Sequence, residues 1–312
     1  MTVRLLTVDG RQFELPVTLR WRILRTGGVP CDEMEAVCLY DGKLGAILPL
    51  CHRFAAYEGT EAVLRGVVDE YAAEVTKEGV LLRLSGRGMA ALLIDNEAEA
   101  ESYQQATLSE ILRRHAGPYV PYEKRRELTG SGVYRVNSGS SQWRAVSGFT
   151  ELAGGFTPYM TALGVLRASP LKGSGRRLSV EAASVAGCTV RERRYGVLSE
   201  VLVKDKSGGR TETVRHEDFL RRGGCRRQVL YMPRRSSGEA MRYTGAYQIQ
   251  KSRALARQVE LTLPGAFQAQ PGDIADLRYP PLGLMGSYDV VEAESRGGPA
   301  GTLTTVVMEA ID

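Results

Sequence analysis

Histidine, tryptophan and closely spaced cysteine are scarce in this chain. Its 312 residues include 3 His, 2 Trp and 5 Cys. The cysteines are Cys31, Cys38, Cys51, Cys188 and Cys225, and no two of them stand two to four residues apart. This spacing predicts neither a zinc ribbon nor a disulfide framework and favours free thiols. Cys51 and His52 are neighbours on an expected strand, so their side chains point to opposite faces and make a poor nucleophile–base pair.

Long apolar runs are also missing. No stretch approaches the roughly 18 apolar residues that a membrane-spanning helix needs. The first ten residues alternate and then turn, without the apolar core of a signal peptide. We therefore expect no membrane insertion, and free thiols fit assembly in a reducing cytoplasm.

Positive charge is moderate overall but unevenly placed. The formal net charge is +5, and a series of arginine doublets falls in the second half of the chain, with the richest stretch between Arg215 and Arg242. Such a stretch indicates either a patch for phosphate or an acidic partner, or a set of solvated loops and strand faces. Aromatic residues do not interleave the doublets as a stacking platform requires. We favour a protein interface or a solvated face over nucleic acid.

Alternating segments separated by turns dominate the first 90 residues. Residues 3–15 contain a hairpin signal, and Tyr40–Lys43 repeats it after an alternating segment. Val63–Val75 reads as one long strand that returns, after a turn at Lys77–Gly79, as Val80–Ser85. These signals predict an antiparallel sheet or barrel.

Helical signals are confined to the middle of the chain. Met89–Ile94 reads as a short helix, and Thr107 with Glu110 fits a capping box for a second one. Apolar residues recur at helical spacing over 141–153 and end at a glycine pair, which predicts a third. The segment 156–168 reads as a hairpin, and short strands resume after residue 178. The fold class predicted is a β-rich α+β protein.

One motif has the form of a phosphate-binding turn. Gly86 to Ala91 reads G-x-G-x-x-A after a strand and before a helix, as a dinucleotide site requires. The acidic stretch next to it, Asp95–Glu101, would repel a pyrophosphate, and the strands around it are hairpin-linked rather than parallel. A nucleotide-cofactor enzyme using this turn is therefore the weaker alternative.

His216 and Glu217 begin like a zinc-protease helix but lack the second histidine, and we expect no metal, no cofactor and no catalysis. His115, in the last turn of its helix, is expected to be a surface or cap residue.

An ordered set of segments resembles the baseplate hub proteins of contractile phage tails and phage-tail-like bacteriocins, the late control protein D-like family. The segments are Arg20–Thr26 with Val29–Pro30, Leu64–Glu70, Leu82–Gly88, Ala91–Ala98, Gln270–Asp273, Leu282–Val290 and Thr302–Met308. The resemblance runs from about residue 20 to the end and is weakest between about 120 and 250.

The resemblance implies a structural baseplate hub that is a homotrimer. Two tube-type antiparallel β-barrel domains per chain would form a pseudo-sixfold ring between the tail tube and the trimeric spike. The expected domains are 1–96, an α/β segment over 97–177, and a second β-domain with the Arg-rich segment over 178–312. Implied partners are the spike, the tube, the tape-measure protein and other baseplate proteins. DNA would be only passing cargo if the particle is a phage. Assembly in the bacterial cytoplasm would precede release in a particle.

The resemblance also assigns structural roles to individual residues. Structural turns are expected at Gly66, Ser85, Gly86, Arg87, Gly88, Asp95, Pro271, Gly272, Asp273 and Gly286. An interface or the lumen wall is expected to hold Arg221, Arg222, Arg226, Arg227, Arg234 and Arg235. A nucleic-acid-binding β-protein that uses residues 215–242 remains the other alternative to the hub.

Overall fold

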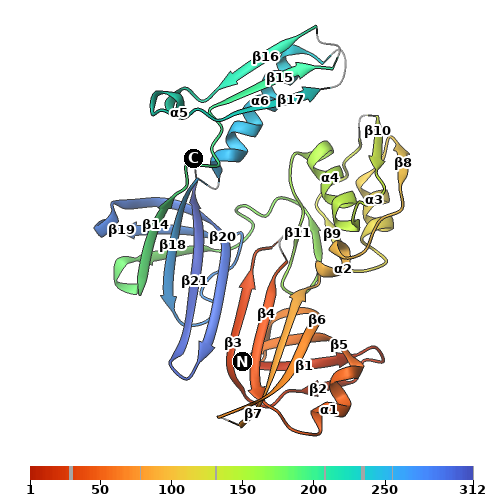
Figure 1. Cartoon of the computed structure of the whole chain (residues 1–312), viewed down its shortest axis with the longest axis vertical. Helices are drawn as coiled ribbons and strands as arrows, with labels where there is room; N and C mark the ends of the chain where they lie inside the picture. The colour runs from red at the N-terminus through yellow and green to blue at the C-terminus, as the bar shows by residue number, and fades with distance from the viewer. Residues whose placement is uncertain are drawn as a thin grey trace.

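The computed structural model describes residues 1–27, 31–77, 79–130, 132–206, 209–232, 236–254 and 256–311. Strands dominate it, and most of the helices are short. The predicted β-rich α+β class is confirmed. Figure 1 shows two curled β units, an α/β unit beside them and a small unit that projects from the second β unit. Each of the four has its own hydrophobic core.

The first β unit holds seven antiparallel strands around one core. They are β1 (Thr2–Thr7), β2 (Gln12–Glu14), β3 (Thr18–Arg25), β4 (Glu33–Leu39), β5 (Cys51–Glu58), β6 (Glu61–Thr76) and β7 (Gly79–Gly88), in the spatial order β3-β4-β7-β6-β5-β1-β2. Alternate residues such as Val3 and Leu5 of β1 are buried, because successive side chains of a strand point to opposite faces. Phe54, Met34 and Leu82 lie in the same core.

Most hairpin predictions for this unit are confirmed. Residues 3–15 form the β1–β2 hairpin, and the two long strands of 63–75 and 80–85 are β6 and β7. The hairpin expected at Tyr40–Lys43 is wrong. The Asp41 side chain accepts a hydrogen bond from the Lys43 amide at 3.0 Å, and the chain then enters α1 (Leu44–Ile47) and η1 (Leu48–Leu50). Leu44 and Leu48 are buried in the core, so packing turns this segment into helix.

The α/β unit, residues 89–168, packs two main helices against short strands. Its elements are α2 (Ala91–Ile94), β8 (Glu101–Gln104), α3 (Leu108–His115), β9 (Tyr122–Lys124), β10 (Val133–Val136), α4 (Gln142–Gly154), β11 (Tyr159–Met160) and β12 (Leu166–Ala168). All three predicted helices are present, as is the 156–168 hairpin. The Thr107 hydroxyl accepts from the Glu110 amide at 3.3 Å, which begins α3. Gly155, in the left-handed conformation, ends α4.

The second β unit completes a continuous sheet with the first. Its strands are β13 (Arg177–Glu181), β14 (Gly187–Glu192), β18 (Arg257–Pro264), β19 (Ile274–Tyr279), β20 (Leu284–Gly298) and β21 (Gly301–Ala310), with η2 (Ala182–Ser184) and η3 (Pro280–Leu282). The order is β14-β18-β21-β20-β19-β13, and only β13 and β19 pair in parallel. Because β20 also pairs with β3, the two β units share one 13-stranded sheet. We call the β3–β20 pairing the seam. It joins elements from opposite ends of the sequence (Figure 1).

A small unit is inserted between β14 and β18, and the sequence did not predict it. It contains β15 (Glu200–Asp205), β16 (Thr211–Arg215), α5 (Glu217–Arg221), β17 (Arg227–Met232) and α6 (Gly238–Ala254). We call it the inserted unit. Val201 and Val203 of β15 meet Met241 and Ile249 of α6 in a separate core. The expected third domain, 178–312, therefore contains two cores.

Candidate interaction surfaces

The glycine motif lies inside a strand. Ser85, Gly86, Arg87 and Gly88 are the last four residues of β7, which pairs on both sides, with β4 and with β6. Gly66, in β6, pairs with Gly88. These residues are not in the turn that we expected; the turn begins only at Met89. Asp95 follows α2 as its C-cap.

The glycines make room for packed neighbours. A Cβ on Gly86 would lie 2.3 Å from the Val67 carbonyl oxygen and 2.7 Å from the Phe54 ring, and one on Gly66 would lie 2.6 Å from the same ring. Gly88 lies against Asp32, and its amide donates to the Asp32 carbonyl at 2.7 Å. Gly86 and Gly88 are thus paired strand residues packed against Phe54 and Asp32 rather than an open turn before a helix, and this geometry opposes a dinucleotide site here.

Arg87 is engaged by two carboxylates of its own chain. Its Nε and Nη2 donate to Asp69 at 2.8 Å each, while Nη1 and Nη2 donate to Asp95 at 3.0 and 2.7 Å. These bonds raise the pKa of Arg87, and the Arg87 guanidinium lowers the pKa of Asp95. The two forked pairs tie the end of β7 to the end of α2.

Pro271, Gly272 and Asp273 precede β19. Gly272 has φ +91°, which favours glycine. The carboxylate of Asp273 is fully buried and accepts from the Arg176 amide at 2.7 Å and the Gln270 amide at 3.0 Å. Asp273 therefore links this turn to the segment that enters β13. Gly286 lies within β20 at φ +134° and pairs with Leu277.

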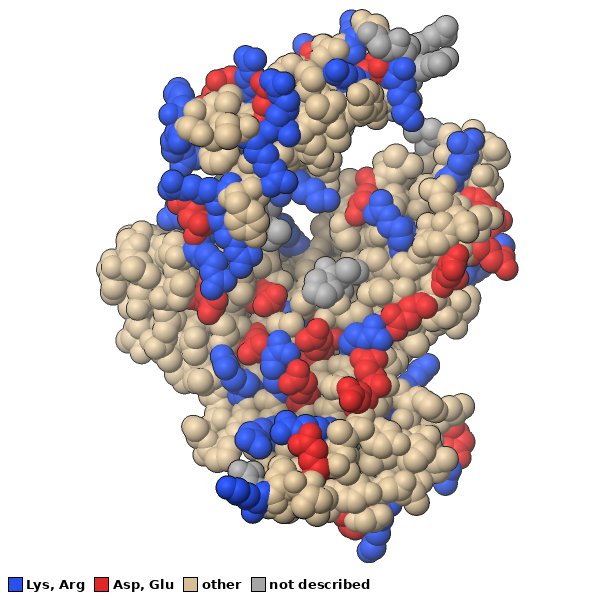
Figure 2. Space-filling model, in the orientation of Figure 1, with Lys and Arg blue, Asp and Glu red and all other residues tan. Residues whose placement is uncertain are grey.

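Charged residues of both signs cross the seam between the β units. Arg22 of β3 donates to Glu294 of β20 at 2.6 Å and to Glu33 of β4 at 3.2 Å. Figure 2 shows red and blue side chains alternating across the middle of the molecule. Beside them, a groove of about 550 Å³ is lined by Arg20, Arg83 and the β20–β21 turn. On the seam's inner side, Trp21 stacks on Phe267 with ring centroids 5.4 Å apart.

His115 is buried, so its expected place on the surface is wrong. Its Nδ1 lies 2.7 Å from the Gln142 side-chain oxygen, and its Nε2 lies 2.9 Å from the Tyr103 hydroxyl. Because an amide oxygen only accepts, Nδ1 carries the proton. Burial lowers the pKa of His115, which favours the neutral ring.

Among the described residues, no group of His, Cys, Asp and Glu is arranged to hold a metal ion.

The inserted unit concentrates the positive charge. Residues 193–257 contain sixteen Lys and Arg but six Asp and Glu, a net charge of +10 in a chain of +5. The rest of the chain is therefore net acidic. Figure 2 shows blue side chains gathered over this unit. A surface of this kind attracts an anionic partner from a distance.

The doublet arginines lie in different places on the inserted unit. Arg221 pairs with Asp218 within α5, and the neighbouring Arg222 donates to the Asp218 carbonyl at 3.2 Å. Arg226 donates to the Tyr195 carbonyl at 2.6 Å, and Arg227 of β17 pairs with Glu200 at 2.6 Å. Arg234 and Arg235 lie outside the described residues.

Aromatic side chains also lie on this basic unit, contrary to the expectation from spacing alone. They are exposed at Tyr195, Tyr231, Tyr243 and Tyr247. The sequence did not predict this grouping, because the tyrosines belong to three separate segments: the one before β15, strand β17 and helix α6. The fold brings these segments into one unit.

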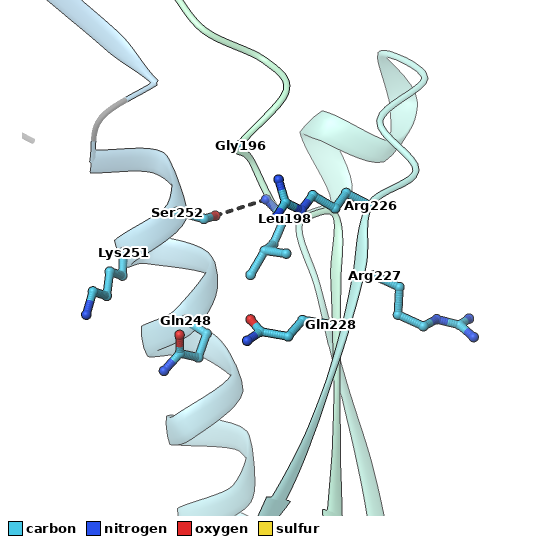
Figure 3. A pocket seen from close by; sticks show the side chains of 8 residues that line it. All are labelled: Gly196, Leu198, Arg226, Arg227, Gln228, Gln248, Lys251 and Ser252. Carbon is cyan, nitrogen blue, oxygen red and sulfur yellow. Dashed lines mark hydrogen bonds between the residues drawn. The ribbon is translucent and has the colours of Figure 1, made fainter. Parts of the chain in front are cut away.

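A groove opens between α6 and β17 (Figure 3). Its volume is about 300 Å³. It is lined by Gly196, Leu198, Arg226, Arg227, Gln228, Gln248, Lys251 and Ser252. The Leu198 amide donates to the Ser252 hydroxyl at 3.0 Å, which closes one end. We call this the β17–α6 groove.

No helix among the described residues is long and apolar enough to span a bilayer. No protein-family model and no curated protein sequence matches the chain.

Solved structures, in contrast, match nearly the whole chain. The 43 kDa tail protein of prophage MuSo2 from Shewanella oneidensis matches with a TM-score of 0.79 at 14% identity, covering 99% of this chain and 96% of that one. The tail protein of Neisseria meningitidis MC58 matches with a TM-score of 0.78 at 15% identity and the same coverage. The chain therefore has the fold of phage tail proteins.

A more distant match widens this class. The E. coli c3393 protein is a component of the type VI secretion system with structural similarity to the T4 tail proteins gp27 and gp5. It matches with a TM-score of 0.57 at 10% identity, over 95% of this chain and 74% of that one. The fold is thus shared between phage tail proteins and a secretion-system component.

Proposed function

We propose that this chain is the structural baseplate hub of a contractile injection system, a phage tail or a phage-tail-like bacteriocin. The observation that carries the proposal is the match to two phage tail proteins over 99% of the chain, including both β units. The role is geometric, and we assign no catalysis or cofactor to it. Digestion of the cell wall would fall to another protein of the particle.

The two β units of each chain would let a threefold ring match a sixfold tail tube. Three copies of a chain with two β units present six β units around one axis, while the ring as a whole keeps threefold symmetry. One face of such a ring fits a sixfold tail tube and the other fits a trimeric spike. Closing the ring would also cover sheet edges that otherwise favour uncontrolled association. The shared sheet through β3 and β20 would hold the two units of each chain in register.

The partners follow from this position. The ring would contact the spike, the tail tube, the tape-measure protein and other baseplate proteins. It would assemble in the bacterial cytoplasm and leave in the particle, with DNA as passing cargo in a phage. Within the ring, the ion pairs of Arg87 with Asp69 and Asp95 and the Pro271–Asp273 turn are structural. We assign Arg221, Arg222, Arg226 and Arg227 to an interface, and the undescribed Arg234 and Arg235 by their place in the sequence.

Co-expression with the spike and tail-tube proteins of the same particle tests the adaptor role. We expect a complex that contains this chain and the spike in equal copy number and binds tube protein at its other face. Separation of all three proteins on size-exclusion chromatography at physiological salt would contradict the proposal.

Nucleic-acid binding is a second candidate, favoured by the +10 charge of residues 193–257. A protein that neutralises many phosphates loses affinity steeply as salt rises. Retention on heparin at low salt with a steep salt dependence for a DNA duplex would support this candidate. Failure to bind heparin at low salt, about 50 mM, would remove it.

A further inference from the structure

Strand β17 has one edge that no described strand covers. It pairs only with β15, in parallel. The carbonyls of Arg226 and Met232 accept from residues at the two ends of β15, so the backbone groups of alternate residues between them face β15. Because the backbone groups of successive strand residues point to opposite sides, those of Arg227, Val229 and Tyr231 point outward. Such an edge is a template for another strand.

Helix α6 leaves this edge open. It packs over β15 and β16, where Gly245 permits close approach: a Cβ there would lie 2.6 Å from Val214 and 3.4 Å from Val203. The β17–α6 groove lies on the other side of this contact. Figure 3 shows the Gln228 and Gln248 amides facing each other across it, with Leu198 beside them. A strand added to β17 would pass this groove at the start of β17, where Arg226, Arg227 and Gln228 line it, and would continue beyond it beside Val229 to Met232.

The two faces beside the edge differ in character. On the helix side of β17, Leu230 and Met232 are half-buried against the small core. On the opposite side, Val229 and Tyr231 are 43% and 63% exposed. An added strand would therefore meet apolar surface with side chains on both of its faces.

The charge around the groove has one sign. Its lining includes Arg226, Arg227 and Lys251 and no carboxylate. The nearby Glu200 lies on the open face of the sheet and is already paired with Arg215 and Arg227, at 3.0 and 2.6 Å. Because Arg227 is held by Glu200, a segment that carries Asp or Glu would meet chiefly Arg226 and Lys251, whereas a basic segment would be repelled.

We propose that the free edge of β17, with the β17–α6 groove at its start, binds an extended, acidic peptide segment of a partner protein as an added strand. A row of alternating amide donors and carbonyl acceptors matches another peptide backbone, and a nucleic acid offers no such row. With six residues in β17, the added strand would be about 20 Å long. The proposal goes beyond the hub assignment, because it names the chemistry of one partner and does not depend on ring formation.

A library of random eight-residue peptides displayed on a surface provides the probe, with the full chain as bait. We expect enrichment of acidic sequences without proline. Synthetic copies should bind the wild-type chain with micromolar Kd in fluorescence anisotropy, more weakly at high salt. Val229→Pro removes an outward amide and leaves the bonds to β15 in place, so we expect at least a tenfold loss of affinity. The matched Val229→Thr keeps the amide and should retain affinity within about threefold.

Two further measurements test the proposal without relying on the Val229→Pro variant. Lys251→Glu should weaken binding at least fivefold without altering the backbone of β17. Peptides methylated at alternate backbone nitrogens remove the same hydrogen bonds from the peptide side, so they test the idea even if Val229→Pro does not fold. Methylation of the nitrogens that face β17 should abolish binding, whereas methylation of those that face away should leave the affinity within about threefold.

Three results would overturn the proposal. The first is a library with no enrichment on the wild-type chain above that on Val229→Pro. The second is equal affinity of the parent and both methylated peptides. The third is a 20-base-pair DNA duplex that binds the wild type and Val229→Pro equally while no peptide binds. The oligomeric mass of each variant, measured in parallel, separates these outcomes from a failure of the hub assignment.

Discussion

The Arg22 guanidinium donates to the Glu294 carboxylate at 2.6 Å, across 272 positions of the sequence. The bond lies where β3 pairs with β20, so it spans the seam between the two β units. Both side chains are partly shielded, at 32% and 21% exposure. A charge-assisted bond of this kind is stronger than an ion pair at a fully solvated surface.

Replacing Glu294 should loosen the seam. Glu294→Gln removes the charge that Arg22 faces most closely, and we expect a loss of about 1 to 3 kcal/mol in the free energy of unfolding. Chemical denaturation followed by tryptophan fluorescence measures it, because Trp21 lies in the same strand as Arg22. The matched variant is Glu35→Gln, which removes a more distant and more exposed partner of Arg22. It should cost less than about 0.5 kcal/mol. Equal effects of the two variants would argue against a special role for the seam bond.

Gly86 should not tolerate a side chain. In Gly86→Ala the new Cβ would meet the Val67 carbonyl oxygen at 2.3 Å and the Phe54 ring at 2.7 Å. Since a backbone atom cannot move aside without breaking the β6–β7 pairing, we expect a loss of about 3 kcal/mol or more. Gly42→Ala is the control, because no atom lies within 4 Å of its added Cβ. Thermal unfolding that shifts equally in both variants would show that the packing around Phe54 is looser than these distances imply.

Acid should destabilise the chain through His115. Its pKa is lowered in the folded state, so between that value and the unfolded value of about 6.5 the unfolded chain binds more protons. Stability should therefore fall as pH drops below about 6.5, by at most about 1.4 kcal/mol per pH unit from this residue. His115→Asn cannot titrate and should show a shallower decline from about pH 7 to pH 5. Parallel declines in the two proteins would contradict the buried neutral ring.

The approach of α6 to its sheet depends on Gly245. Alanine is favoured over glycine in a helix by about 1 kcal/mol, but the Cβ in Gly245→Ala would meet Val214 at 2.6 Å. We expect faster hydrogen exchange of the β15 amides in this variant. In the double variant with Val214→Ala the 2.6 Å contact is removed and the nearest atom is the Cβ of residue 214 at 3.1 Å. Gly245→Ala should therefore cost less protection in the Val214→Ala background than in the wild type. Additive effects of the two substitutions would show that these residues do not meet.

Local patterns predicted most individual elements correctly. The period-2 alternation of β1, the Thr107 cap of α3 and the glycine pair that ends α4 each act over a few residues, so they can be read directly from sequence. The Asp41–Gly42 turn misled because a turn signal does not specify whether a strand or a helix comes next. There the burial of Leu44 and Leu48, a tertiary effect, decided in favour of helix.

The surfaces were harder to predict, because they combine distant segments. In sequence the glycine motif resembles a phosphate-binding turn. In the structure Gly86 packs against Phe54, which lies two strands earlier, and no local pattern indicates this contact. The basic patch could be read as a charge run, but its tyrosines and the free edge of β17 emerge only when β15 to β17 and α6 are assembled. His115 has the sequence position of a helix-end cation, and its burial depends on Tyr103 and Gln142 from other elements.

The most direct test of the hub assignment is the mass and symmetry of the purified chain, alone and with its spike, by mass photometry and single-particle imaging. We expect a ring of three copies with six β units around a central opening, formed by the chain alone or on addition of the spike. A chain that stays monomeric at micromolar concentration in both conditions, with no threefold class in the images, would contradict the assignment.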